Sequence, residues 1–265
     1  MRQLRVEYGR ELLSRLGKDG WSLDSRRVRM LEVLVDRGVM GWEDSRVFGN
    51  LSKVFKMPEY SFSLPRVEAC PGAWDTNESG RIVGLCDVCQ CCYGAHNRYL
   101  HRPVVVKLRE RMGDWKRPEW VLRMVVALLP RKWHRWHDVG DICCPEYAEK
   151  LIEVCKKTPY THHWIPTKTW RVPWAASYLK ELASLKNVTV RWSGTKFVRG
   201  RVKEFGEDVV LGGVVLKGRA PAMVDLKMAS KGEYVICPAH WQGNKCGPCR
   251  VCWDKDVRMV AYPYH

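Results

Sequence analysis

WHRWHDVGDICCPEYAEKLIEVCKKTPYTHHWIPT, residues 133–167, contains the pattern of a complete β-α-β unit. The flanking segments, 133–142 and 161–167, are expected to be strands, and 145–157 is expected to be the helix between them. Pro145 suits the first turn of that helix, where its missing N–H costs no hydrogen bond. The residues that share one face of this helix are Tyr147, Ala148, Leu151, Ile152 and Cys155. This order of elements predicts a parallel sheet.

The same alternation continues along the chain. A second expected helix, 173–186, also begins with a proline, and a third expected strand, 188–194, follows it. His134, His162 and Val188 begin successive strands at intervals of 28 and 26 residues, the length of one β-α unit. The chain is therefore predicted to be α/β, with a parallel sheet that forms a partial β/α barrel of TIM-barrel type, or else an open doubly wound sheet.

The chain is expected to have three parts. Residues 1–46 form an N-terminal extension of two helices, 47–236 form the β/α barrel-like domain with a first cysteine group, and 237–265 form a C-terminal segment with a second. Helices are also expected at 102–112 and 117–129, and strands at 208–217 and 233–237.

The chain is strongly basic. Lysine and arginine outnumber aspartate and glutamate by 45 to 29, which gives a formal net charge of +16. Such a charge favours a polyanionic partner, a nucleic acid or a nucleotide, although a basic surface that serves only solubility has the same composition. The longest apolar stretches are far shorter than a membrane span, and the start of the chain is charged. We therefore expect no membrane segment, no signal peptide and a cytoplasmic location, in the host if the protein is viral.

Two stretches, 70–94 and 237–254, carry the same cysteine pattern. Each begins Cys-Pro-small-x-Trp, passes through a polar loop with glycine, and ends in Cys-x-x-Cys-x-x-Cys before an aromatic residue. The candidate metal ligands are Cys70, Cys86, Cys89 and Cys92 in the first group, and Cys237, Cys246, Cys249 and Cys252 in the second. The first group also has a surplus thiol, Cys91.

This spacing predicts the kind of metal centre. Two residues between cysteines let both sulfurs turn to one side, so three thiolates converge from one short loop. Such a loop with one remote cysteine is typical of the ligands of a [4Fe–4S] cluster, whereas zinc sites of four cysteines use two separate pairs. One or two [4Fe–4S] clusters are therefore predicted, with zinc as the alternative and disulfides or free thiols as a third.

Polar side chains lie in the last part of the three expected strands or just beyond them, at the edge where parallel β/α folds bind ligands. The candidates for acid–base catalysis are His137, Asp138 and Asp141. The candidates for binding the phosphate or carboxylate of a cofactor or substrate are Thr167, Lys168, Ser193, Thr195 and Lys196. In the alternative interpretation, Asp141 caps a helix and the lysines are solvated.

A series of motifs carries a family resemblance. They are GNLSK (49–53), SFSLP followed by CPGA (61–73), the cysteine run that ends in NRY (89–99), RWHDVGDI (135–142), WIPTKTW (164–170) and CGPCRVCWD (246–254). In this order they resemble the phage "gene product eighty-eight" family, from about residue 47 to 255. The resemblance implies a viral or prophage origin and a cysteine-rich metal site, and it implies no particular reaction.

The order of motifs also resembles, more loosely, the radical S-adenosylmethionine (SAM) enzymes. These place a three-cysteine loop before the β/α units of a partial barrel, and 137–141 hold the place of their SAM-contacting segment. Their usual loop is Cys-x3-Cys-x2-Cys, whereas this chain has Cys-x2-Cys-x2-Cys. In addition, Cys70 could be the fourth ligand and so occupy the iron that binds SAM in those enzymes.

Three functions are consistent with these features. The leading hypothesis is an iron–sulfur enzyme of radical-SAM-like architecture that acts on a nucleotide or nucleic acid. The alternative is a non-catalytic nucleic-acid-binding protein with two structural four-cysteine sites of zinc or iron–sulfur. A third is a metal-stabilised virion or interaction protein.

Overall fold

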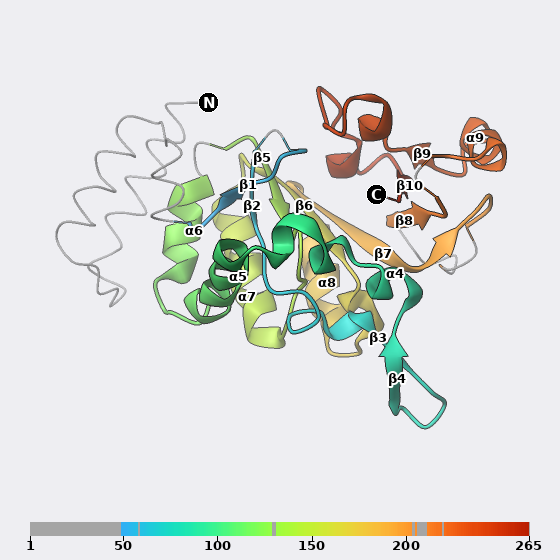
Figure 1. Ribbon diagram of the computed structural model, residues 1–265. Helices are drawn as coiled ribbons and strands as arrows, with labels where there is room; N and C mark the ends of the chain where they lie inside the picture. The colour runs from blue at the N-terminus through green and yellow to red at the C-terminus, as the bar shows by residue number, and fades with distance from the viewer. Residues whose placement is uncertain are drawn as a thin grey trace.

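The computed structural model describes residues 49–57, 59–128, 131–202, 205, 211–218 and 220–264. The helical extension predicted for 1–46 lies outside the described residues. Figure 1 shows a long sheet with helices packed along it and the C-terminal segment at its far end.

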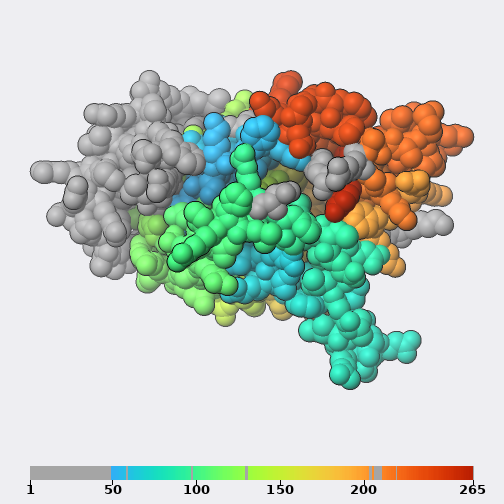
Figure 2. Space-filling view, viewed as in Figure 1, coloured from blue at the N-terminus to red at the C-terminus, as the bar shows by residue number. Residues whose placement is uncertain are grey.

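The main sheet has eight strands among the described residues, in the order β1-β2-β5-β6-β7-β8-β10-β9. They are β1 (Ser52–Lys53), β2 (Tyr60–Phe62), β5 (Trp133–Trp136), β6 (His162–Thr167), β7 (Val188–Val198), β8 (Gly212–Leu216), β9 (Val235–Ile236) and β10 (Met259–Pro263). The β1–β2 pair is antiparallel, and the other neighbours in this sheet are parallel. A separate hairpin, β3 (Trp74–Thr76) and β4 (Ile82–Leu85), projects from the body (Figure 2).

The α/β class and the mostly parallel sheet are confirmed, and the sheet does not close into a barrel. Closure would require the two edge strands to pair with each other. Here β1 and β9 are edge strands of two residues each, and neither pairs with the other. The observed architecture is therefore an open sheet.

Three helices cover one face of this sheet: α6 (Trp120–Leu128), α7 (Pro145–Lys157) and α8 (Ala175–Ser184). The prediction for α7 is confirmed, from Pro145 at its first turn to the five side chains on its apolar face, all of which are buried. They pack with Trp136, Ile165 and Val188 from three neighbouring strands to form the main core. This burial is the principal apolar stabilisation of the fold.

The opposite face of the sheet is covered by the C-terminal segment. Side chains alternate along a strand, so in β6 Ile165 points to the helices and Trp164 points away from them. Trp164 packs with Cys252, Trp253 and Val260 in a second core. The C-terminal cysteine motif is thus folded onto the sheet, and β10 lies between β8 and β9 within it.

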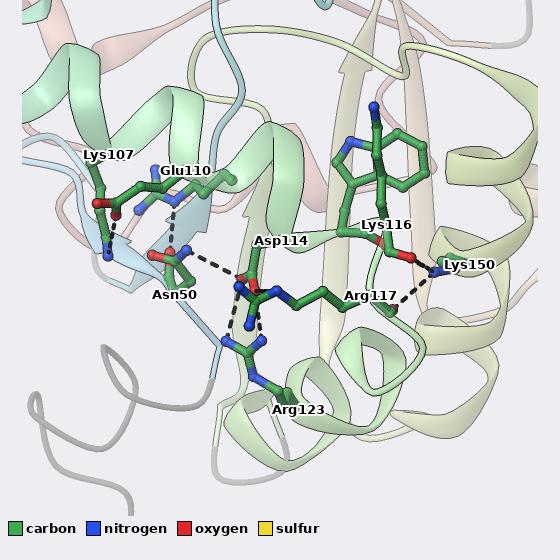
Figure 3. A network of polar contacts seen from close by, with 10 residues as sticks. Asn50, Lys107, Glu110, Asp114, Lys116, Arg117, Arg123 and Lys150 are labelled. Atoms are coloured by element: carbon green, nitrogen blue, oxygen red, sulfur yellow. Dashed lines mark hydrogen bonds and ion pairs between the residues drawn. The ribbon is translucent and has the colours of Figure 1, made fainter. Parts of the chain in front are cut away.

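Helix α5 (Arg102–Asp114) is held against the body by polar contacts (Figure 3). The buried Arg111 donates from Nε to the carbonyl oxygen of Asn50 at 2.7 Å, and Asp114 accepts from Arg123 Nη1 at 2.6 Å. Beyond the helix, Lys150 Nζ donates to the carbonyl oxygens of Trp115, Lys116 and Arg117 at 2.9, 3.3 and 3.0 Å. A cation at a helix C-terminus satisfies carbonyls that have no partner within the helix. These contacts fix which face of α5 points outward.

Candidate functional site

The first cysteine group is built on a repeated turn. Cys86 is the residue before α4 (Asp87–Gln90), and Cys89 lies within this short helix. The amide of Cys89 donates to the carbonyl of Cys86 at 2.8 Å, and the amide of Cys92 donates to the carbonyl of Cys89 at 3.2 Å. The same local hydrogen bond therefore recurs at both Cys-x-x-Cys steps of this group.

The remote Cys70 is brought to this turn by the fold. It lies close enough to Cys89 and Cys92 for their charges to act on one another. Burial raises the pKa of Cys70 to about 12. A hydrogen bond between the side chains of Cys86 and Cys89 lowers the pKa of Cys86 to about 7 and raises that of Cys89.

The first group lies at the carboxyl edge of the sheet, beside Lys168. The Lys168 charge acts on Cys70, Cys86 and Cys89. Arg171, three residues further on at the end of the 3-10 turn Thr169–Arg171, donates from Nη1 to the carbonyls of Gly72 and Trp74 at 2.9 and 3.0 Å. The motif and the end of β6 are therefore joined directly.

This junction requires glycine at position 72. A Cβ atom there would lie 1.9 Å from the Lys168 carbonyl oxygen. We expect Gly72→Ala to lower the free energy of unfolding by about 3 kcal/mol or more, because two backbones would have to separate. Chemical denaturation measures this change.

A matched control is Gly113→Ala in α5, where a Cβ would meet nothing within 4 Å. This change is expected to raise stability by about 0.5–1 kcal/mol, because alanine is favoured over glycine in helices. Equal stability of the Gly72→Ala variant and the unchanged chain would contradict the close packing of the motif on β6.

The second cysteine group lies over the face of the sheet opposite the helices. The amide of Cys237, which follows β9, donates to the carbonyl of Ala261 in β10 at 2.8 Å. Cys246 donates its amide to the Lys56 carbonyl at 2.9 Å, and Cys249 donates to Cys246 at 3.0 Å. Charges act between Cys237 and both Cys246 and Cys249, so the remote cysteine again reaches its loop.

Buried Arg191 organises the last turn of this group. Its Nε donates to the Cys252 carbonyl at 2.9 Å, and Nη2 donates to the Val251 carbonyl at 2.9 Å. Nη1 donates to the Val257 carbonyl at 2.8 Å. Burial raises the pKa of Cys252 to about 12. The loop is therefore tied to β7 by one side chain whose donors pair with backbone oxygens.

Arg135 lies between the two groups. It pairs with Asp138 at 2.8 Å, donates to the Tyr93 hydroxyl at 3.3 Å and stacks 4.6 Å from the centre of the Trp164 ring. Tyr93 follows Cys92 of the first group, and Trp164 packs with the second. Burial would lower the pKa of Arg135, but the oxygens of Tyr93 and Asp138 raise it, so the guanidinium stays charged. The sequence reasoning missed this residue, although an arginine within the aromatic strand WHRW was a signal for a special role.

The three predicted acid–base residues are buried and engaged in contacts. His137 Nε2 is 2.9 Å from the Tyr147 hydroxyl, and burial lowers the pKa of His137 to about 3. Asp138 accepts hydrogen bonds from the Tyr99 hydroxyl and is paired with Arg135.

Asp141 holds the end of β6. It accepts from Thr167 Oγ1 at 2.6 Å and from the amides of Lys168 and Ile142 at 2.7 and 2.8 Å. Burial raises its pKa. The alternative prediction that Asp141 caps a helix is wrong, because Cys144 occupies the position before α7. Asp141 instead joins two strand ends.

The third set of predicted residues lies within a strand and not in the loop after it. Strand β7 continues to Val198, past Ser193, Thr195 and Lys196. The expected strand end at 194 is wrong because β7 pairs again with β8 after an irregularity, Phe197 opposite Val215. Thr195 is buried and Lys196 is exposed.

Among the described residues, no three His, Cys, Asp or Glu side chains are gathered closely enough to hold a metal ion. The eight cysteines of the two groups form no disulfide bonds. A thiol becomes a metal ligand only when it loses its proton. The four sulfurs of a group are therefore expected to come together when a metal binds and displaces their protons. No helix of the described residues is long and apolar enough to cross a membrane.

The fold and the two groups define a class: a cysteine-rich α/β protein with an open, mostly parallel sheet. A family model described as Gene product 88 matches residues 43–255. The chain therefore belongs to the Gene product 88 family, and the match supports the expected viral, bacteriophage origin. Comparison with curated proteins finds no match, and comparison with solved structures finds none. The expected likeness to radical SAM enzymes receives no support from these comparisons.

Proposed function

We propose that the protein is an iron–sulfur protein with two four-cysteine centres, the first of which acts on a nucleotide or nucleic acid. Cys70, Cys86, Cys89 and Cys92 would hold the first cluster, and Cys237, Cys246, Cys249 and Cys252 would hold the second. When bound, a [4Fe–4S] cluster supplies one-electron redox chemistry.

One observation carries this proposal: in each group the remote cysteine lies within electrostatic range of the three-cysteine loop, and the thiols would have to close further to hold a metal. Cys70 is 16 residues before Cys86 in the sequence, yet it neighbours Cys89 and Cys92. Cys237 likewise neighbours Cys246 and Cys249. The same four-cysteine pattern occurs twice in the chain, and a metal centre in each group is a reason for that repetition which packing alone does not supply.

The surroundings of both groups suit a negatively charged centre. Four thiolates around a dicationic cluster leave about two negative charges. Lys168 and Arg171 lie beside the first group, and Lys56 and Arg135 lie beside the second. These cations would offset that charge, and they would set the reduction potential through charge and hydrogen bonding.

The two groups differ in their setting, which supports different roles. The second group belongs to a hydrophobic cluster on the sheet, which includes Cys252 and against which Cys237 and Cys246 pack, whereas only Cys86 of the first group is buried. The first lies at the strand ends, where its neighbour Cys91 is exposed. In the proposed function the second centre stabilises the fold and the first meets the substrate. Lys168 would provide a cation for a phosphate there, while Asp141 and Thr167 hold its loop in place.

Anaerobic purification followed by iron, sulfide and zinc analysis tests this function. We expect brown protein with iron and acid-labile sulfide, and a reduced form with an electron paramagnetic resonance signal. Because Cys70 can complete the first cluster, SAM is expected to leave that signal unchanged. A shift on adding SAM would show an open iron, and colourless protein with zinc alone would contradict the iron–sulfur proposal.

A second candidate is a non-catalytic nucleic-acid-binding protein with two structural metal sites. The observation that favours it is that His137 and Asp141 are buried and hydrogen-bonded to Tyr147 and Thr167, and thus not directed at a substrate. It predicts that chelation unfolds the protein and that the bound metal shows no redox activity.

A further inference from the structure

The outer face of α5 and the turn before it form a basic strip. Arg98, Arg102 and Arg109 are exposed there, and none of their side chains has a hydrogen bond or ion pair with the part of the chain that the structure describes. Arginines without an internal partner keep all their donors available for an external anion. In Figure 2 this part of the chain, in green, lies on the face toward the viewer.

Helical geometry places Arg102 and Arg109 on one side of α5, and Arg98 lies in the turn before it. Positions 102, 106, 109 and 113 are separated by four, three and four residues, so they form one stripe along the helix, and all four are exposed. The opposite side carries Leu108 and Arg111, which are buried and, through Arg111, bonded to the body. The helix therefore cannot turn its basic stripe inward without breaking these contacts.

Few carboxylates neutralise the strip. Glu110 is paired with Lys107 at 3.3 Å, and Asp114 is buried in its contact with Arg123. The positive charge continues beyond the helix at the exposed Lys116, while the exposed Arg117 lies 4.0 Å from Asp114. The strip is thus one place where the formal net charge of +16 is concentrated on a rigid element.

Two further features suit a long ligand lying along the strip. Val106 and Leu100 are exposed among the arginines, at 46% and 64%. Gly113 continues the stripe without a side chain, although a Cβ there would meet no atom of the described chain within 4 Å. Packing within the described chain does not require glycine at position 113. The missing side chain lets the backbone of a ligand approach the helix closely.

We propose that this strip, defined by Arg98, Arg102 and Arg109, binds the phosphate backbone of a nucleic acid. The proposal deepens the proposed function, because it rests on its polyanionic partner and names the surface that binds it. Arg102 and Arg109 are separated by about 10 Å along the helix axis, which spans roughly three base-pair steps of a duplex. Guanidinium groups pair with phosphate oxygens through two parallel hydrogen bonds, and such contacts fix position without reading sequence.

The test is the salt dependence of binding. Fluorescence anisotropy of the full chain, as purified with its metal, is measured with a duplex DNA of arbitrary sequence, a single-stranded DNA and a duplex RNA at several salt concentrations. The test variant is R98Q/R102Q/R109Q. The control, K180Q/K186Q/K227Q, removes the same charge from exposed lysines on α8, after it and on α9 (Met223–Ser230).

For duplex DNA, each phosphate contact contributes about 0.9 to the slope of log K against log salt. The strip variant is therefore expected to lose about 2.7 from the slope, and the control to change it little. Equal weakening by both variants would overturn the proposal, because net charge alone would then explain binding. Salt-insensitive or absent binding of the unchanged chain to all three probes, or binding to anionic vesicles instead, would also overturn it. Metal analysis of the same preparations separates this result from the iron–sulfur proposal. If the protein contains iron but the two variants change the salt slope equally, only the nucleic-acid-binding role of the strip is refuted.

Discussion

Cys92→Ser is expected to lower the iron content from about eight to about four atoms per chain, because one of two [4Fe–4S] clusters loses a ligand. Cys92 lies beside Cys70, and its sulfur would be 3.4 Å from a Cβ at Gly94, so it has a defined place within the first group. Iron and sulfide analysis after anaerobic purification, with the visible spectrum, measures the effect.

The adjacent Cys91→Ser is the matched control. Cys91 is exposed, and it ends α4 rather than joining the other thiols. We expect this variant to keep its full iron content. Loss of iron in both variants would mean that Cys91 is also a ligand or that the turn has collapsed. Full iron in both would refute the assignment of the first group.

Acidification from pH 7 to 5 is expected to remove about 4 kcal/mol of stability, about 2 kcal/mol for each of the buried His137 and His163, and His134 acts in the same direction. Burial lowers the pKa of His137 and His163 to about 3 and that of His134 well below its ordinary value of 6.5. Folded chains keep these rings neutral while unfolded chains bind protons below pH 6.5. Stability is therefore fully present above pH 6.5 and declines as the pH falls toward the folded pKa values.

Denaturant unfolding at several pH values, with metal content measured at each, tests this dependence. His163 accepts from Trp136 Nε1 at 3.1 Å and lies 2.9 Å from Thr158 Oγ1, in the core beneath the helices. His163→Gln is expected to reduce the slope of stability against pH by about 1.4 kcal/mol per unit between pH 6 and 5. The exposed neighbour His162 gives the control variant, His162→Gln, whose slope is compared with that of His163→Gln. The same slope in both variants would show that other groups cause the acid lability.

The elements that the sequence predicts best are those defined by nearest neighbours. Pro145 and the apolar spacing of 145–157 are local signals, and α7 has the predicted bounds. The end of β7 is different, because its continuation to Val198 depends on pairing with β8. The sequence reasoning predicted no strand at Met259–Pro263, where β10 is stabilised by two parallel neighbours that lie earlier in the chain. Such pairing energy is not visible in a five-residue segment.

For the candidate site, the sequence by itself determined the two sets of four cysteines and their turn geometry, because a two-residue spacing fixes where neighbouring sulfurs point. Only the tertiary structure decided what surrounds them. It placed Asp141 and Thr167 in a buried pair and Arg135 between the groups, since these contacts join residues 26 positions apart or more and depend on which strands are neighbours. Charge and spacing are local properties, whereas burial is a property of the whole fold, and burial decides whether a polar side chain meets a ligand or another residue.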